Sequence, residues 1–366
     1  MNILYDHQIF SLQKYGGISR YFYELLNKLD ATEEITTQLP LIVSNNHYIS
    51  NKKFTNHINF VPSIQFRGKQ RIFDFLNKLK SIKHLKKQNF NVFHPTYYDP
   101  YFLSYIKEKP FVLTVHDMIH EKFSNMFPEN DPTSSNKRLL VEKANKIIAI
   151  SESTKRDLVE LFEADPSKIQ VVYHGNSMYP SNNVVSKIDI PKQYILFIGG
   201  RDGYKNFNMF IQSVQKLLLT NTKLCIICAG GGKFNVDELK NFNELNIISQ
   251  IFQYDLDDDV LSYLYQNAEL FVFPSLYEGF GIPILEAFAC ECPLVCSNTS
   301  SFPEVAGDGA CYFDPYNKES VQNAILKVMN DTDTKDILIK NGKKRLEYFS
   351  WEKTILETEN IYKSLL

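Results

Sequence analysis

The chain has 366 residues, of which 44% are hydrophobic and 22% are charged, and its formal net charge is −2. One hydrophobic core rarely serves more than about 250–300 residues, so we expect two domains. The charge gives no argument for a nucleic-acid partner, and no apolar run approaches the roughly 20 residues that span a bilayer. The first ten residues show no secretory signal, which predicts a cytoplasmic protein.

The six cysteines do not predict a disulfide framework in a chain of this length. Cys225 and Cys228 have CxxC spacing, but they lie inside an apolar run, 223–230, that predicts a buried strand. Residues three apart on a strand point to opposite faces, so this pair is poorly placed to share a metal ion. We expect buried thiols in a reducing compartment.

Short apolar runs, each followed by a turn and an amphipathic helix such as 18–29 or 321–329, recur along the chain. This alternation predicts an α/β fold with two Rossmann-like, doubly wound parallel-sheet domains that face each other across a cleft. The expected strands are 2–5, 39–43, 91–94, 111–115, 146–150 and 169–172 in the first half, and 194–198, 224–228, 247–252, 270–273 and 294–296 in the second.

A polar stretch with two prolines, 176–193, separates the two series of strands and predicts a linker. We therefore expect an N-terminal domain over 1–185 and a C-terminal domain over 186–350. A last amphipathic helix, 351–366, has no strand after it, and we expect it to pack back on the N-terminal domain.

The most informative segment is 271–298, where a buried strand leads through a glycine-containing loop into a helix. Gly279 and Gly281 let the backbone approach a ligand closely, and the free N–H groups of a helix start suit an anion. Glu278 lies in the loop and Glu286 eight residues later, on the first turns of the helix. On spacing alone, a plain strand-to-helix turn with two solvated glutamates remains the alternative.

This segment, PSLYEGFGIPILEA, resembles the E-x7-E signature of family 4 of the retaining glycosyltransferases, which have the GT-B fold. Other parts of the chain are similar to this family in the expected order: 15–26, 112–120, 146–158, 171–176, 194–214, 267–275 and 302–315. The resemblance covers nearly the whole chain and is strongest over 194–315.

The resemblance implies that the donor is a nucleotide-diphosphate sugar, bound mainly by the C-terminal domain, and that the N-terminal domain binds the acceptor. Arg201 and Lys205 match the basic pair that holds the departing diphosphate, where a fixed cation needs no reorganisation; a solvated charged loop is the alternative. Glu278 would bind a sugar hydroxyl and Glu286 the ribose. The other donor-binding residues implied are Gly279, Phe280, Gly281 and Ile282.

In the N-terminal domain, Gly16 and Gly17 match the glycine loop that closes on the phosphates, although a simple helix-capping turn would look the same. His116, at the end of an expected strand, matches the histidine beside the donor sugar; a lone histidine can also be structural. Asp117 and His120 are lesser candidates.

We expect no metal ion and no cofactor, because no D-x-D motif stands where a metal-dependent transferase needs one. The acidic run 255–260 is typical of a helix N-terminus.

Residues 67–87 form a strongly basic stretch with apolar residues at helical spacing. The basic residues are Arg67, Lys69, Arg71, Lys78, Lys80, Lys83, Lys86 and Lys87, against one acid, Asp74; the apolar ones are Ile72, Phe75, Leu76, Leu79 and Ile82. Such a helix can lie on an anionic membrane, or it can be a domain helix with a solvated basic face.

The resemblance thus implies a metal-independent, retaining transfer of a hexose from GDP-mannose or a UDP-sugar to a glycan or lipid-linked glycan, in surface polysaccharide synthesis. The alternatives of similar fold are a sugar-nucleotide epimerase, a glycogen-synthase-like enzyme and a non-catalytic nucleotide-sugar-binding protein. A nicotinamide oxidoreductase is disfavoured, because 198–203 has isoleucine where the first glycine of GxGxxG should stand.

Overall fold

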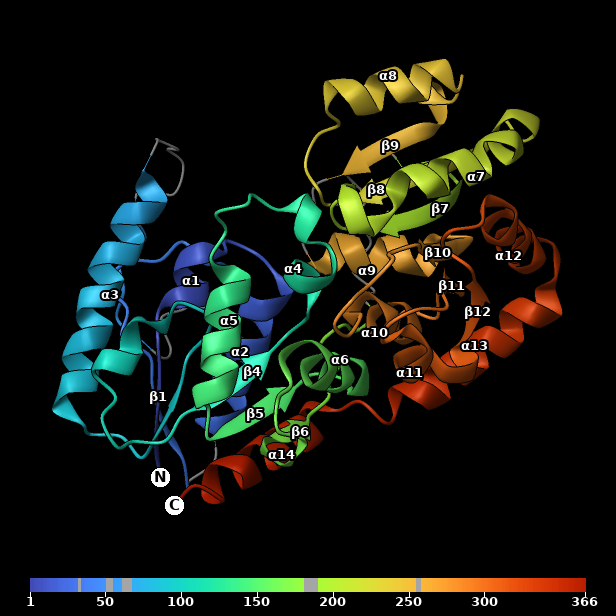
Figure 1. The fold of residues 1–366 in the computed structure, drawn as a ribbon. Helices are drawn as coiled ribbons and strands as arrows, with labels where there is room; N and C mark the ends of the chain where they lie inside the picture. The colour runs from blue at the N-terminus through green and yellow to red at the C-terminus, as the bar shows by residue number, and fades with distance from the viewer. Residues whose placement is uncertain (32–33, 51–54, 61–67, 181–189, 255–257) are drawn as a thin grey trace. The chain divides into compact units, whose positions relative to one another are not determined.

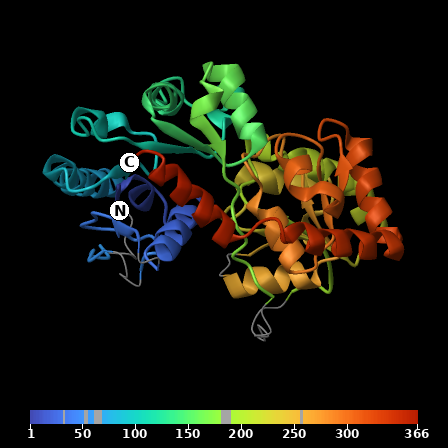
Figure 2. The same cartoon turned by 90° about the horizontal axis from the view of Figure 1, so that it is seen from below.

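The computed structural model describes residues 1–31, 34–50, 55–60, 68–180, 190–254 and 258–366. The described chain forms two compact units, Met1–His174 with Trp351–Leu366, and Gly175–Ser350. The division falls before the expected border at residue 185, which lies outside the described residues. The last helix belongs to the first unit, where both termini lie side by side (Figures 1 and 2).

The first unit is built on six parallel strands. They are β1 (Asn2–Tyr5), β2 (Thr36–Gln38), β3 (Val92–His94), β4 (Val112–Val115), β5 (Lys146–Ala149) and β6 (Ile169–Val171). Strands pair in the orders β2-β1-β3 and β4-β5-β6, and a single parallel bridge between Phe93 and Phe111 joins the two sets. The strand order reverses between β1 and β3, which is the switch point of this sheet.

Helices surround this sheet (Figure 1). They are α1 (Gln8–Leu12), α2 (Gly17–Leu29), α3 (Lys69–Lys87), α4 (Ile119–Lys122), α5 (Thr133–Lys143), α6 (Glu152–Phe162) and α14 (Trp351–Lys363), with 3₁₀ helices η1 (Pro100–Ser104), η2 (Ser124–Met126) and η3 (Pro166–Lys168). Helices α2 and α14 share one hydrophobic core with β1. Within it, the Tyr362 hydroxyl lies 2.7 Å from the Tyr5 hydroxyl and 2.6 Å from His94 Nδ1, which ties α14 to the sheet.

The second unit has one six-stranded parallel sheet, in the order β12-β11-β10-β7-β8-β9. Its strands are β7 (Gln193–Ile198), β8 (Leu224–Ala229), β9 (Ile251–Tyr254), β10 (Leu270–Phe273), β11 (Leu294–Ser297) and β12 (Ala310–Phe313). Counted from β7, this is the Rossmann order, with the switch point between β7 and β10. Ligands of such sheets bind beyond the carboxyl ends of the strands at that point.

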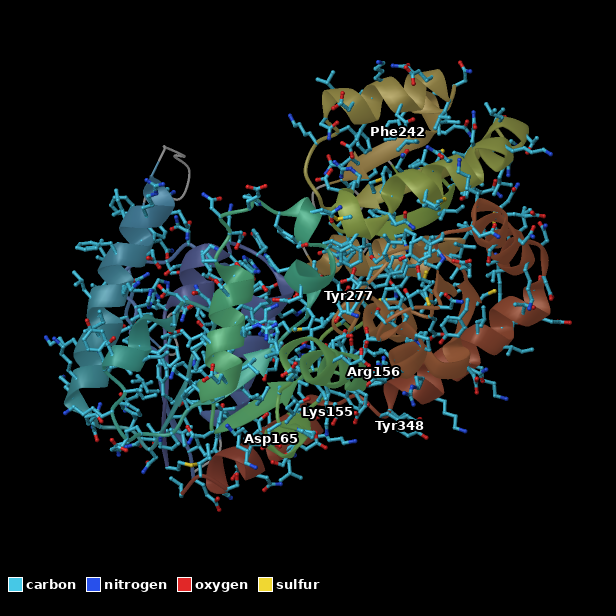
Figure 3. All side chains as sticks on the ribbon, viewed as in Figure 1. Lys155, Arg156, Asp165, Phe242, Tyr277 and Tyr348 are labelled. Atoms are coloured by element: carbon cyan, nitrogen blue, oxygen red, sulfur yellow. The ribbon has the colours of Figure 1, made fainter. Side chains whose placement is uncertain are left out.

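The helices of the second unit are α7 (Phe207–Thr220), α8 (Val236–Glu244), α9 (Asp258–Asn267), α10 (Ile282–Ala289), α11 (Phe302–Ala306), α12 (Lys318–Asn330) and α13 (Thr332–Leu346), with η4 (Gly203–Lys205), η5 (Ile248–Gln250) and η6 (Gly307–Gly309). Alternate residues of the strands, such as Ile195 and Phe197, pack with α7, α8 and α12 in one core. Phe242 of α8, labelled in Figure 3, belongs to it. No helix among the described residues is long and apolar enough to cross a membrane.

Two expected strands were wrong in position, and one strand was missed. The run 39–43 is buried but is not a strand, and β2 precedes it at Thr36–Gln38. Pro40 lacks an N–H group and cannot donate to a sheet. The expected strand 247–252 begins only at Ile251, after the 3₁₀ turn η5, and β12 was not predicted.

Candidate active site

The basic loop and the glutamate loop meet at the switch point of the second sheet. Lys205 ends η4, which follows β7, and Glu278 lies in the loop after β10. The Lys205 Nζ atom is 2.7 Å from Glu278 Oε1, and both side chains are largely buried. The Leu276 N–H also donates to the Tyr204 carbonyl at 2.7 Å, so backbone and side chains join the two loops.

Three hydroxyl residues after β11 hold the glutamate loop, and the sequence analysis missed all of them. The Ser301 hydroxyl donates to the carbonyls of Glu278 and Phe280, at 3.0 and 2.8 Å. The Thr299 hydroxyl donates to the Leu276 carbonyl at 3.0 Å, and the Glu278 N–H donates to Ser300 Oγ at 3.1 Å. The run of hydroxyl residues directly after a buried strand was the signal available in the sequence.

The glycine loop turns sharply into α10. Gly281 has φ +101°, a left-handed conformation that favours glycine, and a β-carbon there would lie 3.0 Å from Ile284 Cδ1. Ile282 starts the helix. Gly279 is buried, and the Phe280 ring packs edge-on against Phe349. Because this contact occupies the Phe280 ring, only the backbone of 279–281 is available to a ligand.

Glu286 is buried on the second turn of α10, with only 6% of its surface exposed. The Tyr265 hydroxyl, from α9, donates to Glu286 Oε2 at 3.1 Å. Burial, and then the Glu286 carboxylate, raise the pKa of Tyr265 well above its usual value, so its hydroxyl stays a donor. Tyr265 is a further residue that the sequence analysis missed.

Arg201 makes a different set of contacts from Lys205. Its Nε donates to Glu238 Oε1 of α8 at 2.5 Å, and its two terminal nitrogens donate to the carbonyls of Gly230, Gly232 and Lys233. The guanidinium thus braces the turn after β8, and no described contact joins it to Lys205 or Glu278. The expected role of Arg201 and Lys205 as a basic pair on the donor diphosphate stays a prediction.

In the first unit, His116 directly follows β4 and is buried against α2. Its ring packs edge-on against Tyr21, at a centroid distance of 5.3 Å, and the backbone N–H of His116 donates to the Tyr98 hydroxyl. Burial lowers the pKa of His116 to about 3, so the imidazole is neutral at physiological pH. Its Nε2 is buried and has no hydrogen-bond partner among the described residues.

A buried lysine holds the segment that follows His116. Lys137 of α5 is fully buried, and its ammonium donates to the Asp117 carbonyl at 2.9 Å and to Glu121 Oε2 at 2.8 Å. It also lies over the ring of Tyr98. A buried cation is costly unless it is paired in this way. The sequence analysis also missed Lys137.

Gly16 and Gly17 stand at the start of α2, as the pattern predicts. The Ser19 N–H, in the first turn of this helix, donates to Gln13 Oε1 at 3.1 Å. A β-carbon on Gly16 would collide with the Gln13 amide group. The glycine therefore leaves room for a side chain that caps the helix.

Two family models match successive parts of the chain: Glycosyltransferase Family 4 over residues 15–176, and Glycosyl transferases group 1 over residues 180–345. The chain is a glycosyltransferase. It is 28% identical to O-antigen chain mannosyltransferase B of Escherichia coli, over 95% of this chain and 96% of that relative.

Solved structures show that this glycosyltransferase has the GT-B fold. Sucrose-phosphate synthase of Thermosynechococcus elongatus aligns with a TM-score of 0.79 at 19% identity, covering all of this chain and 98% of that one. Anabaena HepE in complex with UDP and glucose aligns with a TM-score of 0.76 at 15% identity, covering 99% of each chain.

The candidate site residues thus form two sets, one in each unit. Lys205, Glu278 and the glycine loop before α10 gather in the second unit, and His116 and the start of α2 lie in the first. Among the described residues, no group of three or more His, Cys, Asp or Glu side chains is arranged to hold a metal ion. Independence from metal and cofactor stays a prediction, as do the roles of the individual residues.

Proposed function

We propose that this glycosyltransferase moves a hexose, with retention, from GDP-mannose or a UDP-sugar to a glycan or lipid-linked glycan during surface polysaccharide synthesis in the cytoplasm. The names of its relatives support a polysaccharide product, because the Escherichia coli relative is an O-antigen chain mannosyltransferase. The observation that carries the proposal is the contact between Lys205 and Glu278. It lies at the switch point of the second sheet, whose strands follow the Rossmann order found in nucleotide-binding domains.

Lys205 is suited to stabilise the departing diphosphate. Its ammonium is fixed by Glu278 and lies 5.9 Å from the centre of the Phe273 ring, so it is held in place before any donor arrives. The negative charge on the diphosphate grows as the glycosidic bond breaks. A cation that is already oriented stabilises this charge more than it stabilises the ground state.

Glu278 is proposed as a hydroxyl-binding and electrostatic residue. One carboxylate oxygen contacts Lys205, and the loop that carries the side chain is fixed by the hydroxyls that follow β11. The acceptor hydroxyl would attack on the face from which the diphosphate leaves, through an oxocarbenium-like state. This route needs no covalent carboxylate nucleophile.

His116 is proposed to contact the donor sugar as a neutral imidazole. Its depressed pKa excludes a protonated role near pH 7, and its buried Nε2 can exchange a hydrogen bond with a sugar hydroxyl. Glu286, oriented by Tyr265, is proposed to accept hydrogen bonds from the ribose.

A thermal-shift screen over UDP, GDP, ADP and their sugars tests the proposal. A ligand at 100 times its Kd adds about 2.7 kcal/mol of stability. We expect one nucleotide series to stabilise the protein, and the corresponding sugar to be transferred with its anomeric configuration kept. Inversion of configuration, or no stabilisation by any nucleotide, would contradict the proposal.

We further propose that α3 makes a peripheral contact with an anionic membrane. The apolar residues Ile72, Phe75 and Leu79 share one face of α3 and are 43%, 62% and 50% exposed. Lys83 and Lys86 continue that face and are also exposed. An exposed apolar face with adjoining lysines suits a bilayer interface better than open water.

Vesicle sedimentation tests this contact. We expect binding to vesicles that contain anionic lipid, weakening with salt. The paired changes Phe75→Ser and Leu79→Ser, or Lys83→Glu and Lys86→Glu, should abolish it. The control Lys340→Glu and Lys344→Glu places the same charges on exposed positions of α13 and should leave it unchanged. Equal binding by all variants would show that α3 is only a solvated helix.

A further inference from the structure

A cavity of about 640 Å³ lies in the first unit, beside α5. Its volume falls within the range of roughly 300–1,000 Å³ of small-molecule sites. Residues from α4, η2, the loop after η2, α5 and the end of α6 line it; the ones that matter here are His120, Glu121, Phe127, Asp131, Ser134 and Arg138. None of them has been given a role in the proposed donor site, although His120 was a lesser candidate in the sequence.

Two flat surfaces line this cavity. The His120 imidazole stacks on the Phe127 ring with centroids 3.9 Å apart and an angle of 22°. The Arg138 guanidinium lies 4.4 Å from the centre of the Phe162 ring and donates to the Leu161 carbonyl. Flat, rigid, partly apolar surfaces of this kind can pack against the C–H face of a pyranose ring.

Carboxylates supply the polar part of the lining. Asp131 accepts from the Thr133 N–H at 2.8 Å, and hydrogen bonds from Thr133 lower its pKa, so it is ionised at neutral pH. Glu129 also lines the cavity, as does Glu121, whose charge is paired with Lys137, against the single guanidinium of Arg138 in the lining. Carboxylates accept strongly from hydroxyl groups, and their charge repels phosphate. This chemistry suits a neutral sugar and not a nucleotide or a lipid diphosphate.

The cavity wall is connected to the segment that carries His116. Glu121 Oε2 binds the buried ammonium of Lys137, and the same ammonium holds the carbonyl of Asp117, the residue after His116. The other oxygen, Glu121 Oε1, has no hydrogen-bond partner among the described residues. One buried cation thus fixes both a wall of the cavity and the backbone beside the proposed donor-sugar histidine.

We propose that this cavity is a subsite for a neutral saccharide unit of the acceptor glycan. The proposal rests on the proposed function, because it assumes that the acceptor is a glycan. A saccharide bound here would hold a growing chain on the first unit, away from the hydroxyl that reacts. It should therefore change the affinity for the acceptor and leave hydrolysis of the donor alone.

The test blocks the cavity with Ser134→Trp in the full chain. We expect the acceptor KM to rise at least about tenfold, with the donor KM and the rate of donor hydrolysis without acceptor unchanged. The control is Ser135→Trp, because Ser135 is the next residue of α5, is exposed and does not line the cavity. Equal acceptor KM values for the two variants would overturn the proposal.

A second pair of variants tests the same cavity without introducing a bulky side chain. Asp131→Asn removes a charge from the cavity but keeps an oxygen to cap Thr133. Asp165→Asn makes the same change in a matched Asp-Pro turn, where Asp165 accepts from the Ser167 N–H at 2.9 Å; this exposed residue is labelled in Figure 3. We expect only Asp131→Asn to weaken acceptor binding, and no difference between the two would count against the subsite.

Direct binding separates this proposal from the proposed function. Saturation-transfer NMR with α-1,2-mannobiose, α-1,3-mannobiose and maltose should give a signal that Ser134→Trp removes and Ser135→Trp keeps. If that signal is present but no nucleotide sugar supports transfer, the proposed function fails and the subsite stands. If transfer is intact but no disaccharide gives a signal sensitive to Ser134→Trp, the subsite is wrong.

Discussion

The Lys205 ammonium lies 2.7 Å from the Glu278 carboxylate, across the point where the strand order of the second sheet reverses. The two residues are 73 positions apart in the chain, and they come from neighbouring strands, β7 and β10. Each side chain is mostly buried, so solvent screens the pair only partly. This pair brings a fixed cation and a fixed carboxylate to the edge of the sheet where ligands of such folds bind.

Transfer is predicted to proceed without a metal ion. Lys205 supplies positive charge at the proposed diphosphate site, and no described cluster of acidic, histidine or cysteine side chains could hold a cation there. Initial rates in excess EDTA should match those without it. A complete loss that Mg²⁺ or Mn²⁺ restores would mean that a divalent ion takes the role assigned to Lys205.

The stability of the first unit is predicted to fall in acid. Burial lowers the pKa values of His94, His116 and His174 to about 3, against 6.5 in the unfolded chain. Between about pH 3 and 6.5 the unfolded state therefore binds protons that the folded state does not, so stability rises with pH in this window and levels off above it. Each imidazole contributes a slope of about 1.4 kcal/mol per pH unit at most.

Trp351 fluorescence can follow this transition during urea unfolding, because the single tryptophan is buried in the first unit and packs against His174. His174→Gln should reduce the dependence on pH between pH 5 and 7. His47→Gln, a change at an exposed position, is the control and should not. Stability that is the same at pH 5 and 7 would show that the buried imidazoles do not control unfolding.

Arg201 is predicted to matter for stability. Arg201→Ala would remove one donor from the Glu238 carboxylate, which keeps the Asn235 N–H, and from three backbone carbonyls. Loss of one partner of a buried pair typically costs about 3–5 kcal/mol. Glu238 is partly solvated, so we expect the lower end of that range in urea unfolding. Lys240→Ala removes an exposed ion pair from the same helix, α8, and should cost under about 1 kcal/mol. Equal effects would contradict a bracing role for Arg201.

Much of the fold could be predicted from the sequence, because each buried strand is a short apolar run that ends at a turn. The predictions failed at 39–43, where Val43 pairs with Ile58 in an isolated parallel bridge and Pro40 cannot donate to a sheet. They also failed at β12, whose sequence ACYF is short and only partly buried.

Individual residues of the candidate site could be predicted from the sequence, but the contacts between them could not. The motifs indicated Lys205 and Glu278, but nothing in the sequence indicated that these two side chains would pair. The partners of Arg201 and Glu286, which are Glu238 and Tyr265, lie on other helices and belong to no motif. The sequence around Lys137 is polar and indicates a surface lysine. Its burial follows from tertiary packing alone.

The comparison of Lys205→Ala with Glu286→Ala tests the central claim most directly. Lys205→Ala should lower kcat roughly 100- to 1,000-fold, or about 2.7–4 kcal/mol, with a smaller effect on donor binding. Glu286→Ala should instead raise the donor KM, because the ribose is held equally in the ground and transition states.

Steady-state kinetics with a circular-dichroism melt of each variant measures both effects. Lys233→Ala, which removes an exposed cation from the turn after β8, is the control and should keep wild-type kinetics. A folded Lys205→Ala variant with kcat reduced at least 100-fold is the result that this account predicts. A folded Lys205→Ala variant that keeps the wild-type kcat would contradict it.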